Sequence, residues 1–185
     1  IIRGFVALRP PSVQSDRESA RRTQCSNHLK QMGMAIHLFA DIRKTLPSSR
    51  LGPQHATWFV QILPQMEQDA IYSQWNIADT YYLQSQGART AHVMEYSCPT
   101  RRSASLSRDF EISSTGIPDT QQYPGILGDY AGNGGQFAGS IVDNPLCRGA
   151  MCQADATLAG KHVVKTNSQP VLASMQDGTS NTLPW

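Results

Sequence analysis

The sequence predicts an α+β fold, in which a long N-terminal α-helix packs on a small antiparallel β-sheet head with long loops. Three observations predict it: one helical repeat of apolar residues near the N-terminus, short strand-like segments further along, and many Gly, Pro, Ser and Thr residues between them. A chain of 185 residues suits one domain with an extension. We therefore expect a helix over residues 1–40 and a β-rich globular head over 41–185, together forming a single structural unit.

The long helix is predicted from Ser12 to about Phe39. Its apolar residues follow one another at intervals of three, four and three residues, which places them on one stripe of the helix. Acidic and basic residues alternate ahead of this stripe, a pattern typical of a solvated helix. We expect the N-terminal half to protrude and the C-terminal half to dock on the head through Leu29, Met32, Ile36 and Phe39.

The segments that follow are predicted to be short. Thr45 to Pro53 has the Pro and Gly content of a loop. From Trp58 to Trp75, apolar residues lie near helical spacing and Pro64 interrupts them. This pattern predicts one turn of helix, a kink and a second short helix, with an apolar side that covers a sheet.

Strand signals are found in the second half of the chain. His92 to Cys98 alternates sufficiently to predict a strand, and Val163 to Val171 predicts a last one. Arg101 to Gly125 is rich in polar residues and is predicted to be a long surface excursion. Asp129 to Gly139 contains four glycines and must turn tightly, and Asp177-Gly178 signals another turn.

The charge of the chain excludes one class of function. Charged residues make up 16% of the sequence and the net charge is only +2, whereas a nucleic-acid binder concentrates Lys and Arg on one face. A neutral, polar surface suits an exported protein. The chain contains no run of eighteen apolar residues, so we expect no transmembrane helix within it.

The four cysteines predict disulfides, because their number is even and no Cys-x-x-Cys motif suggests zinc or redox chemistry. Of the three possible pairings we favour Cys25 with Cys98 and Cys147 with Cys152. The second pair closes a short loop that contains Gly149, which contributes about 2 kcal/mol in the chain-entropy model. The alternative is four buried free thiols.

No catalytic motif is found. The sequence lacks Gly-x-Ser-x-Gly, His-Glu-x-x-His and a phosphate-binding loop that ends in Gly-Lys-Ser or Gly-Lys-Thr. The five histidines are scattered, without the spacing of metal ligands on one helix face. We therefore expect no enzymatic activity.

Five segments, in this order, resemble a known family. They are similar to a large planctomycete family of prepilin-like proteins, the domain of unknown function 1559, which has a type IV pilin or pseudopilin N-terminus. The resemblance covers most of the chain and implies a pilin-like fold. The segments are ESARRTQCSNHLKQMGMAIHLF (18–39), ILPQMEQDAIYSQWN (62–76), YSCPTRR (96–102), DYAGNGG (129–135) and QDGTSNT (176–182).

The resemblance also implies an apolar segment at the N-terminus that contacts the membrane before assembly. Arg3, Arg9 and Pro10 depart from that pattern. Compared with the family, we expect both ends of this chain to be incomplete.

Calcium is the one metal that the resemblance suggests, because related pseudopilins bind it through loop carboxylates. The oxygen-bearing residues on predicted loops are Asp129, Asp143, Asn144, Asp155 and Asp177. No Asp-x-Asp-x-Asp spacing organises them, which favours ordinary turn-forming Asp residues. We expect no other cofactor, and retain Asp129, Asp143 and Asp177 as the calcium candidates.

These observations predict a non-enzymatic structural subunit of an extracellular pilin-like filament or pseudopilus. The chain is expected to be exported to a filament or the cell surface, and to assemble with copies of itself, with secretion or pilus machinery as a further partner. The helix positions expected to pack in assembly are Val13, Ala20, Leu29, Met32, Ile36 and Phe39.

The alternative is an anchored, ligand-binding or glycan-binding head at the cell surface that does not polymerise. Trp58, Trp75, Tyr81 and Tyr82 would then stack on the ligand. The helical spacing of the two tryptophans favours their burial in the core instead. Micrographs discriminate the two functions, since one predicts filaments and the other discrete particles.

Overall fold

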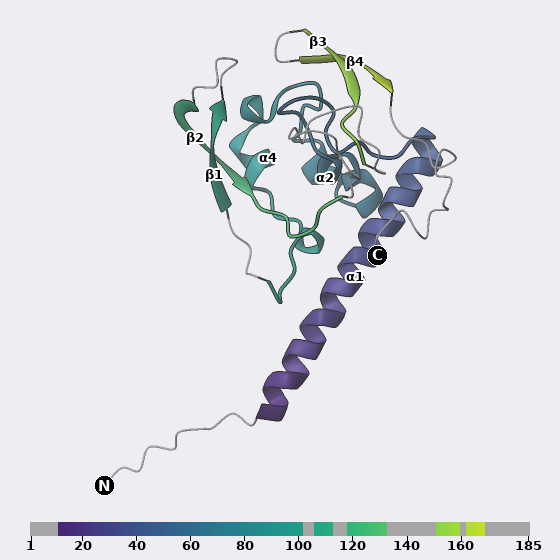
Figure 1. Cartoon of the computed structure of the whole chain (residues 1–185), viewed down its shortest axis with the longest axis vertical. Coiled ribbons are helices and arrows are strands. Elements are labelled where there is room, and N and C mark those ends of the chain that lie inside the picture. Colours follow the sequence, from purple (N-terminus) through teal and green to yellow (C-terminus); the bar gives the residue numbers. More distant parts are fainter. Residues whose placement is uncertain (1–10, 102–105, 113–117, 133–150, 160–161, 169–185) are drawn as a thin grey trace, which may run out of the picture.

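The longest element of the chain is helix α1 (Pro11–Arg43), which runs along the head and continues well beyond it (Figure 1). The computed structural model describes residues 11–101, 106–112, 118–132, 151–159 and 162–168. Within these ranges, no helix combines the length and hydrophobicity that crossing a bilayer requires.

The C-terminal half of α1 docks on the head as predicted. Met32, Ile36 and Phe39 are buried in the core, and Leu29 is partly buried against it. The helix ends at Arg43, four residues later than predicted. Lys44 then adopts a left-handed conformation with φ 61°, and its N–H donates to the Ala40 carbonyl at 2.8 Å. This backbone turn ends the helix without a glycine.

Three short helical segments follow: α2 (Trp58–Gln61), the 3₁₀ helix η1 (Leu63–Met66) and α3 (Asp69–Tyr72). Pro64 lies at the start of η1, where its missing N–H costs no hydrogen bond. The predicted turn, kink and second short helix are therefore confirmed. Their apolar side does not cover a sheet as we expected, because η1 contacts α1 instead.

Three further segments complete the helical part of the head: η2 (Tyr81–Leu83), α4 (Gln86–Thr90) and η3 (Met94–Tyr96). The prediction of a strand over His92–Cys98 was wrong, because η3 occupies it. Val93 and Tyr96 are both buried, and the Tyr96 N–H donates to the Val93 carbonyl at 3.1 Å. Their separation of three residues fits a 3₁₀ turn rather than the two-residue period of a strand.

The strands form two separate antiparallel hairpins at the edge of the head (Figure 1). β1 (Leu106–Ile112) pairs with β2 (Pro118–Ile126), and β3 (Asp155–Ala159) pairs with β4 (His162–Ser168). The α+β fold with a long helix and small antiparallel sheets is thus confirmed, as is the last strand, which begins at His162. The segment predicted as a surface excursion, Arg101–Gly125, contains most of the first hairpin, whose strands we did not predict.

The core of the head lies between α1 and the short helices. Leu46 and Ile62 are fully buried there. Gln61, also buried, satisfies the backbone of Ser48 in both directions, donating to its carbonyl at 2.8 Å and accepting from its N–H at 3.2 Å. A buried amide with both groups paired fixes the loop after α1 against α2.

Candidate functional site

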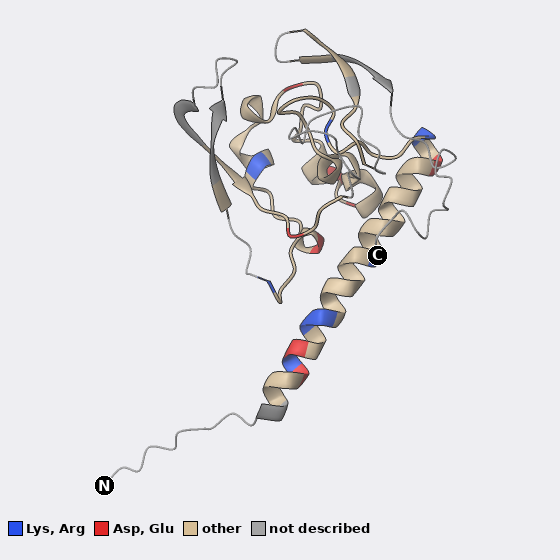
Figure 2. Cartoon of the chain, in the orientation of Figure 1, with Lys and Arg blue, Asp and Glu red and all other residues tan. Residues whose placement is uncertain are grey.

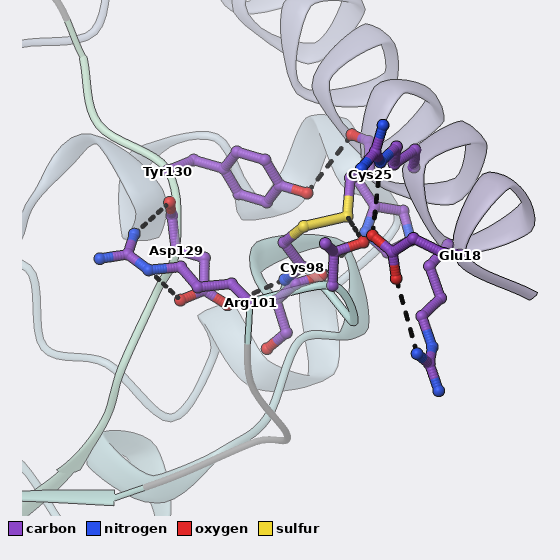
Figure 3. The surroundings of a disulfide bond; sticks show 11 residues. Glu18, Cys25, Cys98, Arg101, Asp129 and Tyr130 are labelled. Atoms are coloured by element: carbon purple, nitrogen blue, oxygen red, sulfur yellow. Dashed lines mark hydrogen bonds and ion pairs between the residues drawn. A yellow bond between two sulfur atoms is a disulfide. The ribbon is translucent and has the colours of Figure 1, made fainter. Parts of the chain in front are cut away.

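A disulfide between Cys25 and Cys98 joins α1 to the segment that follows η3 (Figure 3). This pairing confirms the prediction and closes a sequence separation of 73 residues. Cys152 is also disulfide-bonded. Cys147 lies outside the described residues, so its pairing with Cys152 stays a prediction.

Asp129 supports the head side of this disulfide. Its side chain is 1% exposed, and its Oδ2 accepts the Cys98 N–H at 2.9 Å. Its own N–H donates to the Tyr96 carbonyl at 2.9 Å. Arg101 contacts Asp129 twice. Its Nε lies 3.7 Å from Asp129 Oδ1, and its Nη1 donates to the Asp129 carbonyl at 3.1 Å. The buried carboxylate therefore holds the backbone around Cys98 in place.

Two side chains connect the helix to the same region. Tyr130 Oη donates to the Cys25 carbonyl at 3.3 Å. Burial of its ring, and then the charge of Asp129, raise the pKa of the Tyr130 phenol above its usual value, which keeps this donor protonated. His28 is buried, and its Nδ1 lies 3.0 Å from the Ser97 carbonyl. Because a carbonyl only accepts, Nδ1 carries the proton.

We call this group the junction: Cys25, His28, Ser97, Cys98, Arg101, Asp129 and Tyr130. It brings together three of the five segments that carry the family resemblance, 18–39, 96–102 and 129–135. The sequence alone did not predict the parts played by His28, Asp129 and Tyr130. Their effect is mechanical: the contacts of His28 and Tyr130 tie the helix to the head, and those of Asp129 hold the backbone around Cys98 in place.

Of the three calcium candidates, only Asp129 lies among the described residues. Asp129 uses its carboxylate on Cys98 and Arg101. Asp143, Asn144 and Asp177 lie outside the described residues, and the side chain of Asp155 is not described. Among the residues that are described, no group of three or more His, Cys, Asp or Glu residues could hold a metal ion.

The six positions predicted to pack in assembly divide into two faces of α1. Leu29, Met32, Ile36 and Phe39 face the head. Val13 is 38% exposed, and Ala20 is also exposed. The second pair belongs to the projecting half of the helix, away from the head (Figure 1).

Three large apolar residues on α1 are exposed and were missed by the sequence reasoning: Met34 at 61%, Leu38 at 51% and Ile42 at 67%. At 100° per residue, all three lie within about 40° of the direction of Ala20, and so does Val13. Their i, i+4, i+8 spacing is visible in the sequence, but it is interleaved with the spacing of the head-facing residues Leu29, Met32, Ile36 and Phe39. We call these residues the outer stripe: Val13, Ala20, Met34, Leu38 and Ile42.

Charges surround the projecting part of the outer stripe (Figure 2). Glu18 pairs with Arg21 at 3.6 Å and with Arg22 at 3.4 Å, one helical turn away in each case. Such exposed pairs contribute little to stability, typically 0–1 kcal/mol. They keep the projecting half solvated, as predicted, and leave the outer stripe as its apolar surface.

The aromatic residues considered for ligand stacking are also divided by the structure. Trp58 is buried and stacks on Phe59 with ring centroids 4.0 Å apart. Trp75, Tyr81 and Tyr82 line one cavity of about 450 Å³ in the head. Three of the four aromatic candidates therefore line the same cavity.

A comparison with known families gives one match. The family model described as "Protein of unknown function (DUF1559)" matches residues 14–184, which include nearly all of α1 and the head. None of the curated proteins and none of the solved structures matches the chain. The planctomycete origin and the pilin-type N-terminus implied by the resemblance stay predictions.

Proposed function

The chain belongs to the DUF1559 family of proteins of unknown function, and we propose a function from the arrangement of its helix and head. The protein is a non-enzymatic structural subunit of an extracellular pilin-like filament or pseudopilus. Copies of the chain assemble through α1, and secretion or pilus machinery is the further partner.

The outer stripe is the observation that carries this proposal. α1 is 33 residues long, which corresponds to about 50 Å, and the stripe follows most of that length. Three of its five residues are large apolar side chains that are more than half exposed. The exposed apolar cluster of Met34, Leu38 and Ile42 is typical of a protein interface. Gln24, Asn27 and Gln31 occupy the same side of the helix between this cluster and Ala20. The length of the outer stripe favours another helix as the partner.

The projection of α1 favours an open assembly. When projecting helices of neighbouring copies pack side by side with an offset along their axes, each contact joins two different parts of the chain and is heterologous. Heterologous contacts that do not close into a ring generate filaments. The charged residues around Ala20 determine how two neighbouring helices align along their axes, while the apolar residues provide the affinity between them.

The junction supports the same function. A filament subunit transmits force from its helix to its head, and a covalent bond between Cys25 and Cys98 prevents the two from separating. Disulfides also persist in oxidising compartments, which supports export to the cell surface or beyond.

Electron micrographs of the purified chain, with two matched variants, test the proposal. Ala20→Asp places a carboxylate on the outer stripe, and burying it in a helix bundle costs several kcal/mol. Ser15→Asp adds the same charge to the projecting half, about 140° around the helix from Ala20. We expect filaments from the wild type and Ser15→Asp, and none from Ala20→Asp, with unchanged circular dichroism. Discrete particles from the wild type, or filaments from all three, would contradict the proposal.

A further inference from the structure

The cavity in the head has the dimensions of a small-molecule site. Its volume is about 450 Å³, within the 300–1,000 Å³ range usual for ligand pockets. Its walls come from η2, α4, the end of β2 and the segments before and after α2. It lies in the head, so any ligand there is a property of the head rather than of helix assembly.

The lining combines an apolar wall with positive charge. Aromatic rings of Phe59, Trp75, Tyr81 and Tyr82 line it together with aliphatic side chains. Its charged or titratable nitrogen groups are Arg50, His55 and Arg89, and none of the described residues that line it is acidic. An apolar wall with cationic groups and no carboxylate matches a ligand that brings its own negative charge.

Arg89 is the centre of this charge. It is 8% exposed, and Nη1 donates to the Gln84 carbonyl at 2.8 Å and to the Tyr82 carbonyl at 3.4 Å. Its Nε is buried and has no hydrogen-bond partner among the described residues. In the described part of the chain, no Asp or Glu forms an ion pair with it. Buried donors and charges of this kind are normally satisfied.

Two tyrosine rings hold the guanidinium in position. Its central carbon lies 5.8 Å from the ring centre of Tyr81 and 5.1 Å from that of Tyr123. Since the two bonds to backbone carbonyls come from Nη1, the described residues leave the edge formed by Nε and Nη2 without a hydrogen bond. That edge presents two parallel N–H groups, the arrangement that binds both oxygens of a carboxylate.

We infer that this cavity binds a small organic carboxylate with an apolar, ring-containing body. The carboxylate pairs with Arg89, and the ring lies against Trp75, Tyr81 and Tyr82. The apolar wall sets the class of ligand, because an inorganic anion would gain nothing from aromatic surfaces.

The close approach of β2 to the Tyr81 ring, which lines the cavity, requires a glycine at position 125. A Cβ at Gly125 on β2 would lie 1.8 Å from Tyr81 Oη, so only glycine lets the strand approach that ring.

Calorimetric titration with two matched probes tests the inference. The probes are 4-phenylbutyrate and its uncharged amide, 4-phenylbutyramide, which differ only in the group offered to Arg89. We expect wild type to bind the carboxylate at least about tenfold more tightly than the amide, the value of one charge-assisted contact. Arg89→Gln should abolish this preference, whereas Arg43→Gln, an equal loss of charge at the end of α1, should leave it unchanged.

A second variant keeps the test decisive if Arg89→Gln does not fold. Ala91→Leu leaves Arg89 in place and enlarges a side chain that lines the cavity. Loss of carboxylate binding in Ala91→Leu, with an unchanged melting temperature, supports the site. The inference is overturned if wild type binds neither probe, if it binds both equally, if the preference for the carboxylate survives in Arg89→Gln, or if carboxylate binding survives in Ala91→Leu.

Discussion

Replacing Cys25 and Cys98 together by serine should destabilise the protein substantially, because the disulfide restricts the unfolded chain. A cross-link that closes 73 residues lowers the entropy of the unfolded chain by about 15 cal/mol/K, which is about 4 kcal/mol at 25 °C. Domains of ordinary stability unfold with about 5–15 kcal/mol, so the loss is a large fraction of the total. The contacts of Asp129 and Tyr130 remain in the variant.

Urea titration followed by circular dichroism measures this loss. We expect a lower midpoint and a steeper dependence on urea, since the unfolded chain without the cross-link exposes more surface. Tyr130→Phe is the matched control: it removes only the hydrogen bond to the Cys25 carbonyl and should cost about 1 kcal/mol. A loss in the double-serine variant no larger than in this control would refute the reasoning, because the contacts around the disulfide would then suffice without it.

Two further predictions concern the core and the two faces of α1. Burial, and then the charge of Glu95, raise the pKa of the Tyr96 phenol above the value of about 10 that tyrosine has in an unfolded chain. The neutral phenol therefore stabilises the fold fully below about pH 10, and this contribution is lost as the pH rises above that value. Urea titrations between pH 8 and 11 should show a loss approaching about 1.4 kcal/mol per pH unit in the wild type and a smaller loss in Tyr96→Phe, and equal slopes would be inconsistent with this account. Ile36→Ala should cost about 2–5 kcal/mol because it empties a core position, whereas Leu38→Ala on the outer stripe should change stability by less than about 0.5 kcal/mol and weaken self-association measured by sedimentation. The reverse order of stabilities would show that the faces are assigned wrongly.

Local patterns predicted the long helix and its docking face. The spacing of Leu29, Met32, Ile36 and Phe39 depends only on the helical period, so it could be recognised without knowing what they contact. The Cys25–Cys98 pairing was also predicted, on the count of cysteines and the preference for the short loop in the other pair. Neither inference required a three-dimensional arrangement.

The β1–β2 hairpin and η3 could not be predicted in the same way. Leu106, Phe110 and Ile112 alternate with polar residues, but the surrounding Ser, Thr and Pro residues indicated a loop more strongly. Val93 and Tyr96 were assigned a strand period, whereas burial of both against the helical core imposes a 3₁₀ turn. Tertiary packing decides such short elements.

The junction and the cavity are beyond local patterns because their residues come from distant segments. Asp129 meets Cys98 across 31 residues, and Tyr130 meets Cys25 across 105. Arg89 was not considered at all, because a single arginine in a polar segment gives no sign of burial. That Arg89 Nε has no hydrogen-bond partner among the described residues can be recognised only from the three-dimensional structure.

The position of the disulfide also determines what proteolysis can do to this protein. All peptide bonds between Cys25 and Cys98 lie inside the loop that the disulfide closes, including those of the segments around α3 and η2. A single cut anywhere in this loop leaves both products covalently joined, with the projecting helix still attached to the rest of the head. Only a cut on the N-terminal side of Cys25 separates the projecting residues from the head. Inside the loop, separation also requires reduction of the disulfide. A protease can therefore nick the protein within this loop while the connection between its two parts is retained.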